Sequence, residues 1–199
     1  MKLLRTTILA FVLVSCLLAC TGRDEPENYD RKIAEANRAL ELNPRDAAAY
    51  YNRANAYYQK GDWDRALVDF NRTLELNSKN PDAYYNRGNA FLRKENWDRA
   101  IADFTRALDL NPQLMMAYFT RGLAYAQKGD FERAIADFSR VLEINPKDSK
   151  AHYKKAELLD KAGKKQEALE AYRKFLKHAP PQAKKYVQQA QERIKALGK

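Results

Sequence analysis

Residues 50–66 read YYNRANAYYQKGDWDRA, and residues 84–100 read YYNRGNAFLRKENWDRA. Eleven of these 17 positions are identical, and a third version, YFTRGLAYAQKGDFERA, occupies residues 118–134. The three copies begin at Tyr50, Tyr84 and Tyr118, so the interval between them is constant. Self-similarity at a fixed period of this size indicates a protein built from stacked structural repeats.

The spacing of apolar residues within one copy predicts two helices. Tyr50, Ala54 and Tyr57 recur at helical intervals, and the apolar residues that follow them do the same. The pattern predicts helices near residues 47–60 and 63–76 in the first copy. One such pair cannot bury its apolar faces alone, so neighbouring pairs must stack.

Small and capping residues recur with the same period. Small side chains, which allow paired helices to approach closely, stand at Ala54, Gly88, Gly122 and Ala156 and at Ala66, Ala100, Ala134 and Ala168. Residues suited to cap the second helices are Asp62, Asn96 and Asp130. Asn-Pro pairs at 43–44, 111–112 and 145–146 are expected to end second helices, because Asn tolerates a left-handed conformation there and Pro cannot continue the helix.

The chain resembles the tetratricopeptide repeat family over essentially its whole length after the leader. The residues that carry the resemblance in the first three units are Tyr50, Ala54, Tyr57, Gly61, Ala66 and Phe70; Tyr84, Gly88, Phe91, Ala100, Phe104 and Pro112; Tyr118, Gly122, Tyr125, Gly129, Ala134 and Phe138. The fourth unit keeps Ala156, Gly163 and Ala168, but His152 and Lys165 replace aromatic residues. The resemblance implies an all-α fold, an α-solenoid of antiparallel helix pairs wound into a right-handed superhelix.

The period divides the chain into units with atypical ends. The four complete units are 47–80, 81–114, 115–148 and 149–182. Residues 29–43 align with the second helix of a unit whose first helix is absent, and residues 183–199 predict a C-terminal capping helix with Tyr186, Val187, Ala190, Ile194 and Leu197 facing inward. Atypical terminal units are expected in a stacked array.

A basic residue recurs in each first helix, at Arg53, Arg87, Arg121 and Lys155. The preceding second helices carry an acid at one repeated place, occupied by Glu35, Asp69, Asp103 and Asp137 in turn, which favours ion pairs between neighbouring repeats over a ladder for phosphates. Pairing with the acid of the following second helix also fits, except at Lys155, which would meet Ala171. Separately, Arg65, Arg99 and Arg133 precede acids by four residues, which predicts surface pairs within a helix.

The resemblance implies that first helices line a concave groove that binds a protein or an extended peptide. The residues expected in this groove are Tyr51, Asn52, Asn55, Tyr58, Tyr85, Asn86, Asn89, Arg93, Phe119, Lys150 and Lys154. An Asn amide both donates and accepts, so it can hold a peptide backbone without reading its sequence. The aromatic residues at Tyr51, Tyr85 and Phe119 alternatively support helix packing. A family clamp for terminal carboxylates is matched incompletely, because Tyr51, Met116 and Thr120 depart from it.

The formal net charge of +10 is concentrated at one end. Residues 149–182 carry +5 and residues 183–199 carry +4. A solvated capping helix explains this charge, and contact with an acidic protein or with anionic lipid head groups is the alternative. Nucleic acid is not expected as a partner.

The first twenty residues, MKLLRTTILAFVLVSCLLAC, predict a leader. The apolar run from Thr6 to Ala19 suits a signal peptide and falls short of the roughly 20 residues that a spanning helix needs. Leu17 to Cys20 resembles a bacterial lipobox, which implies a signal peptide over 1–19, lipidation at Cys20 and a linker over 20–28. Cleavage at Cys16, a plain secreted protein and an uncleaved anchor are the alternatives. If the host is Gram-negative, Thr21 after the Cys resembles the signal for sorting to the outer membrane.

No constellation in the sequence indicates an enzyme, a cofactor or a metal site. The two histidines, His152 and His178, lack metal-ligand spacing, and both cysteines lie in the leader. We therefore expect an extracytoplasmic, lipid-anchored interaction scaffold, in the role of an envelope-assembly adaptor. The alternative is a self-associating solenoid, in which the missing first helix before residue 29 leaves an apolar face on which two copies form a homodimer.

Overall fold

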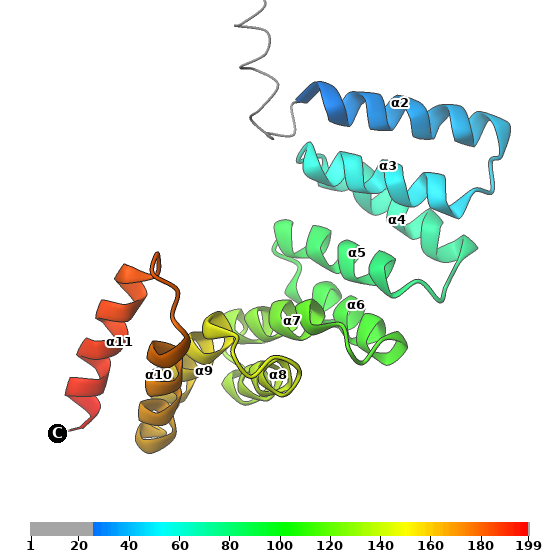
Figure 1. The fold of residues 1–199 in the computed structure, drawn as a ribbon. Coiled ribbons are helices and arrows are strands. Elements are labelled where there is room, and N and C mark those ends of the chain that lie inside the picture. The colour runs from blue at the N-terminus through cyan, green and yellow to red at the C-terminus, as the bar shows by residue number, and fades with distance from the viewer. Residues whose placement is uncertain (1–25, 199) are drawn as a thin grey trace, which may run out of the picture.

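The structure is a computed structural model that describes residues 26–198, and this part of the chain consists of helices joined by short turns (Figure 1). The helices are α2 (Pro26–Leu42), α3 (Ala47–Gln59), α4 (Trp63–Leu76), α5 (Pro81–Arg93), α6 (Trp97–Leu110), α7 (Met115–Gln127), α8 (Phe131–Ile144), α9 (Ser149–Lys161), α10 (Lys165–His178) and α11 (Lys184–Leu197). The prediction of an all-α solenoid is confirmed. Helix α2 begins at Pro26, inside the segment expected to be linker.

Each repeat is one antiparallel pair, in which a first helix packs against the second helix that follows it. The pairs are α3 with α4, α5 with α6, α7 with α8, and α9 with α10. The second helices of the first three repeats each bury a large side chain at the same position of the repeat. These residues, Phe70, Phe104 and Phe138, are completely buried. The small residues predicted from the sequence make room for these rings, since a Cβ built on Gly88 would lie 2.7 Å from the ring of Phe104.

Capping explains where the helices begin and end. The predicted caps are confirmed, because the side chains of Asp62, Asn96 and Asp130 each accept a hydrogen bond from the backbone N–H three residues later. The prediction of left-handed Asn at the helix ends is wrong: φ is −137° at Asn111 and −131° at Asn145. These residues are extended because the turn to the next repeat must lead the chain away from the second helix.

The turn within each repeat does need the left-handed conformation. Gly61, Gly129 and Gly163 have φ between 74° and 81°, which glycine adopts without steric cost. In the second repeat this place is taken by Glu95, with φ of 56°. That residue is therefore the one strained turn position among residues 26–198.

The stack of pairs bends as it proceeds from α2 to α11 (Figure 1). First helices of neighbouring repeats contact each other, α3 with α5 and α5 with α7. Because elements lie closest together on the inner side of a curve, the first helices form the concave side. No helix among the described residues is both long enough and apolar enough to span a membrane.

The helix α11 closes the C-terminal end of the core. Ala190 is fully buried, and Val187, Ile194 and Leu197 pack against the cluster formed by α9 and α10. Tyr186, which was expected to face inward, is 49% exposed. Its ring nevertheless lies 5.1 Å from that of Tyr153, at the edge of a pocket described below.

Candidate protein-binding groove

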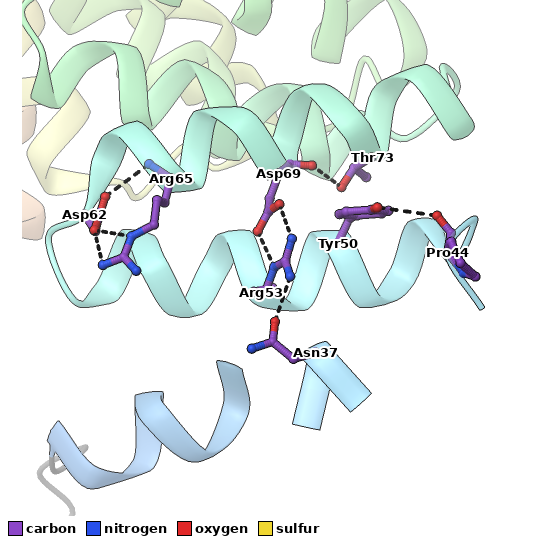
Figure 2. Close-up of polar contacts among 8 residues, drawn as sticks. All are labelled: Asn37, Pro44, Tyr50, Arg53, Asp62, Arg65, Asp69 and Thr73. Carbon is purple, nitrogen blue, oxygen red and sulfur yellow. Dashed lines mark hydrogen bonds and ion pairs between the residues drawn. The ribbon is translucent and has the colours of Figure 1, made fainter. Parts of the chain in front are cut away.

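Three of the four repeated basic residues of the first helices, all arginines, form buried ion pairs. Arg53 donates two hydrogen bonds of 2.7 Å to Asp69, which lies in the second helix of the same repeat (Figure 2). A further nitrogen of Arg53 donates to Asn37 of the preceding helix, α2, at 2.7 Å. Arg87 and Arg121 repeat this arrangement with Asp103 and Asp137. These guanidinium groups therefore hold helices together and are not available to bind phosphate.

The prediction of which acid each Arg binds is wrong. The sequence favoured the acid of the preceding second helix, whereas each Arg binds the acid of the second helix that follows it in its own repeat. The preceding second helix supplies a neutral acceptor instead, such as Asn71 for Arg87 and Thr105 for Arg121. The last basic residue, Lys155, lacks an acid at Ala171 and donates to Ser139.

Burial changes the electrostatics of these carboxylates. Desolvation raises the pKa of Asp103 and of Asp137, and the hydrogen bonds from Arg87 and Arg121 oppose this shift. Desolvation also lowers the pKa of Lys155, which forms no ion pair with a described residue. In the second and third repeats, the ion pair with Arg therefore offsets part of the free-energy cost of burying the Asp carboxylate.

Two other sets of charged contacts also differ from the prediction. Arg65 does not reach the acid four residues later but pairs with the capping residue Asp62 (Figure 2). Arg133 pairs in the same way with Asp130, and Arg99 lies over the ring of Phe91 with no ion pair to a described residue. Ion pairs between neighbouring repeats do exist, but they join the turn to the preceding second helix: Lys60 to Asp30, Lys94 to Asp64 and Lys128 to Asp98. All are exposed, so each contributes below about 1 kcal/mol to stability.

Three of the predicted groove residues meet in one cluster. Asn86 on α5 donates a hydrogen bond of 2.9 Å to the hydroxyl of Tyr51 and one of 3.0 Å to the side-chain oxygen of Asn55, both on α3. Burial raises the pKa of Tyr51, so this hydroxyl stays protonated. The cluster ties two neighbouring first helices together, and Asn86 has a packing role in addition to any role in binding.

Other groove residues keep free polar groups. Asn52 is exposed and Asn89 is partly exposed, and neither amide has a hydrogen-bond partner among the described residues. Arg93 donates to the hydroxyl of Tyr58 at 3.2 Å, which extends the contacts between α3 and α5 toward their ends. Asn52 and Asn89 are thus the predicted amides that are available to a ligand.

The aromatic residues at the fifth place of each repeat pack on the second helices. Ring centroids lie 6.1 Å apart for Tyr51 and Phe70, 5.8 Å for Tyr85 and Phe104, and 5.3 Å for Phe119 and Phe138. Each ring is only partly buried, so one edge supports the core and the other reaches the concave surface.

The C-terminal end of the groove contains an apolar pocket of about 410 Å³. Its lining includes Phe119, Lys150, Tyr153, Lys154, Phe175 and Tyr186. Three predicted groove residues are thereby brought together across two repeats. Burial raises the pKa of Tyr153 to about 12, and its hydroxyl donates to Gln189 on α11 at 2.9 Å. The contribution of Phe175 and Tyr186 was not foreseen, because it depends on how α10 packs on α9 and α11 packs on α10.

The two lysines at this pocket differ in their surroundings. Lys154 pairs with Glu157 at 2.8 Å, whereas Lys150 is exposed and has no ion pair with any described residue. The groove therefore changes from amide and tyrosine groups at α3 and α5 to an apolar pocket with a free cation at α9. No group of three or more His, Cys, Asp or Glu side chains within residues 26–198 could hold a metal ion. Cys20 lies outside the described residues.

A curved stack of helix pairs with the first helices inside defines an α-solenoid of the repeat-scaffold class. Four family models described as tetratricopeptide or TPR repeats match residues 35–68, 54–95, 88–158 and 125–194. Together they run without a gap from residue 35 to residue 194, and the chain is therefore built of tetratricopeptide repeats. No curated protein matches the sequence.

Solved structures share this fold. MamA is 23% identical, with a TM-score of 0.75 over 79% of this chain and 92% of that one. YrrB, described as a TPR protein with an unusual peptide-binding site, is 28% identical, with a TM-score of 0.70 over 78% and 80%. The first TPR domain of Spaghetti (RPAP3), solved with an HSP90 peptide, is 26% identical, with a TM-score of 0.57 over 59% and 93%.

Proposed function

We propose that this protein is a membrane-tethered, extracytoplasmic scaffold that holds a partner protein or an extended peptide on the concave side of its repeats. The observation that supports the proposal is that several polar and charged side chains of the first helices have no partner among the described residues. Asn52 and Asn89 offer free amides, and the pocket at Phe119 and Lys150 offers apolar surface beside a free cation. YrrB and the Spaghetti domain, which share the fold, are described with a peptide-binding site and a bound peptide.

The anchor is part of the same proposal. Cys20 follows a short apolar leader and precedes the polar stretch TGRDEPEN. Acylation there by several chains would attach the protein stably to a bilayer, since a single chain gives only marginal binding. The scaffold would then act close to the envelope surface, at the outer membrane in a Gram-negative host, as an adaptor for envelope assembly.

The groove is tested with a double variant, Asn52→Ala and Asn89→Ala. Crosslinking in the native envelope first identifies a partner, and titration calorimetry with that purified partner then measures affinity. We expect at least a tenfold loss of affinity with an unchanged melting temperature, because neither amide bonds another described residue.

Asn86→Ala is the matched comparison. This variant loses two hydrogen bonds between α3 and α5 and should therefore melt at a lower temperature. A partner that binds the double variant as tightly as the wild type would show that the groove assignment is wrong.

The anchor is tested by metabolic labelling with palmitate. We expect incorporation to be lost in Cys20→Ala and retained in Cys16→Ala. Loss of label only in Cys16→Ala would move the lipid to the alternative site, and labelling in neither wild type nor variants would refute the tether.

A further inference from the structure

Within the described residues, the N-terminal repeat is incomplete, and a cavity lies where the other repeats have a first helix. In each complete repeat, a first helix covers the second helix that follows it, but α2 is a second helix without a described first helix before it. A cavity of about 600 Å³ lies between α2 and α3 at this place. We call it the N-terminal slot; its lining includes Glu35, Ala36, Ala39, Ala49, Asn52 and Ala56.

The interior of the stack shows what such a slot accepts. One repeat further on, the space that corresponds to the slot is occupied by α3, which contacts both α4 and α5. There Asn86 donates to Tyr51 and Asn55 across the contact between first helices. Asn52 stands one period before Asn86, is exposed and has no hydrogen-bond partner among residues 26–198. Its free amide is therefore placed to donate to a helix in the slot.

The charge of the occupant follows from Glu35. Glu35 stands one period before Asp69, the carboxylate that receives two hydrogen bonds from Arg53 of its own first helix. The carboxylate of Glu35 is 63% exposed and meets only Arg31 among the described residues, at 3.6 Å on the same helix. A helix in the slot would bring a basic residue to Glu35, as α3 brings Arg53 to Asp69.

The size of the occupant follows from Ala36. This residue stands where α4, α6 and α8 carry Phe70, Phe104 and Phe138 and α10 carries Tyr172. Those rings fill the space next to a Gly or Ala of the first helix, so closely that a Cβ on Gly88 would meet Phe104 at 2.7 Å. With Ala36 in place of the ring, the facing position of an incoming helix has room for a bulky apolar side chain.

We propose that the N-terminal slot is a docking site for one amphipathic helix of another protein. That helix carries a basic residue opposite Glu35 and, next to it in sequence, a bulky apolar residue over Ala36. The chain's own residues one period earlier do not fit this description, since Ala19 stands at the basic place and Cys20 at the apolar place. The slot shares Asn52 with the concave groove, but Glu35 and Ala36 belong to a second helix and are not groove residues, so variants at these two positions test the slot by itself.

The chain supplies a probe for this site. A fluorescein-labelled peptide of residues 81–93, stapled on its exposed face and carrying Gly88→Leu, presents Arg87 and a bulky neighbour in the required order. Stapling is needed because isolated helices of this length are marginal in water. Anisotropy titrations with the full chain should show saturable binding, weakened at least tenfold by Glu35→Arg and by Ala36→Phe.

A charge swap separates docking from loss of fold. A second probe with Arg87→Glu should bind Glu35→Arg at least tenfold more tightly than it binds the wild type. Glu41→Arg makes the same charge change at an exposed site of α2 outside the slot and should alter binding of either probe less than twofold.

Three results would overturn the proposal. The first is absence of saturable binding to the folded full chain, as would follow if residues before Pro26 or a second copy held the slot. The second is equal weakening by Glu35→Arg and Glu41→Arg. The third is failure of the charge-swapped pair to recover binding while circular dichroism shows an unchanged helix content.

Discussion

At the scale of single residues, the most informative feature is the repeated pair of buried charges. Asp103 is 5% exposed and receives both of its hydrogen bonds from Arg87, which in turn reaches back to Asn71. Each Arg thus joins three helices from two repeats. Such a group fixes the relative position of helices, although replacing a buried pair with apolar residues is often neutral or stabilising.

Arg87→Met should be strongly destabilising. The variant leaves the carboxylate of Asp103 buried without its partner, and we expect the free energy of unfolding to fall by about 3 kcal/mol at pH 7, measured by urea denaturation. Because Arg87 opposes the rise in the pKa of Asp103, its removal raises that pKa further. The loss should therefore appear as pH rises above about 4 and vanish below it, where the carboxyl is protonated in both states.

The control is the double variant Arg87→Met with Asp103→Leu, which should recover most of the stability. Arg106→Met, an exposed change on the same second helix, should alter it by less than about 0.5 kcal/mol. If the single variant is as stable as the wild type, the pair has no role in fixing the helices.

At the scale of elements, the fourth repeat departs from the others on one face. His152 takes the place of Tyr50, whose hydroxyl donates to the Pro44 carbonyl at 3.4 Å (Figure 2). The Nε2 atom of His152 lies 2.9 Å from the Pro146 carbonyl, so the imidazole keeps the same contact. Its ring stacks on that of His178, with centroids 5.9 Å apart. His152 thus replaces a phenol, and His178 stands where the preceding repeat has Ile144. The contact of α9 with the loop before it therefore contains a titratable ring.

We expect the fourth repeat to loosen in mild acid. Burial lowers the pKa of His152, the hydrogen bond to Pro146 opposes this, and His178, Lys174 and Lys155 lower it further. A folded-state pKa below the unfolded value means that the unfolded chain binds more protons, so stability falls as pH drops below about 6.5. Melting curves between pH 7.5 and 5.5 should show the decrease.

His152→Tyr, which restores the residue of the first three repeats, should make melting less dependent on pH over this range. His178→Ala should do so only in part, because burial is the largest cause of the shift in the pKa of His152. An identical pH dependence in His152→Tyr and wild type would assign the effect to other groups.

At the scale of the whole molecule, the stack is a one-dimensional array in which each repeat contacts its neighbours. The middle repeats have a neighbour on both sides, whereas α2 lacks a described first helix and α11 lacks a described second helix. Stability in such an array is approximately a sum of repeat and interface contributions. The ends should therefore open more easily than the middle.

Hydrogen exchange followed by mass spectrometry tests this gradient. We expect amides of α6, α7 and α8 to exchange most slowly, and those of α2 and α11 most rapidly, because the terminal helices lose contacts on one side. Occupation of the N-terminal slot by the stapled probe should slow exchange in α2 and leave α11 unchanged. Uniform protection from α2 to α11 would show instead that the chain unfolds as a single unit.

The sequence was sufficient for the repeat and for most of its local structure. The constant period, the alternation of large and small apolar residues and the caps at Asp62, Asn96 and Asp130 act within one helix or one helix pair. Because such interactions are short-range, the sequence pattern is sufficient to predict them. The groove residues were placed by family resemblance, and they stay predictions until a partner is titrated against variants.

Only the tertiary structure decided which of these residues meet. Arg87 had two acids within a plausible distance in sequence, and the packing of α5 on α6 selected Asp103. The pocket at Phe119 and Tyr186 and the slot beside Glu35 likewise depend on how helices from different repeats lie against each other. Within the four complete repeats, the period by itself determined where the helices begin and which faces are apolar, because those are properties of one helix. The packing between neighbouring helices determines which side chains remain free for a partner. A small rotation between two helices would exchange one set of contacts for another.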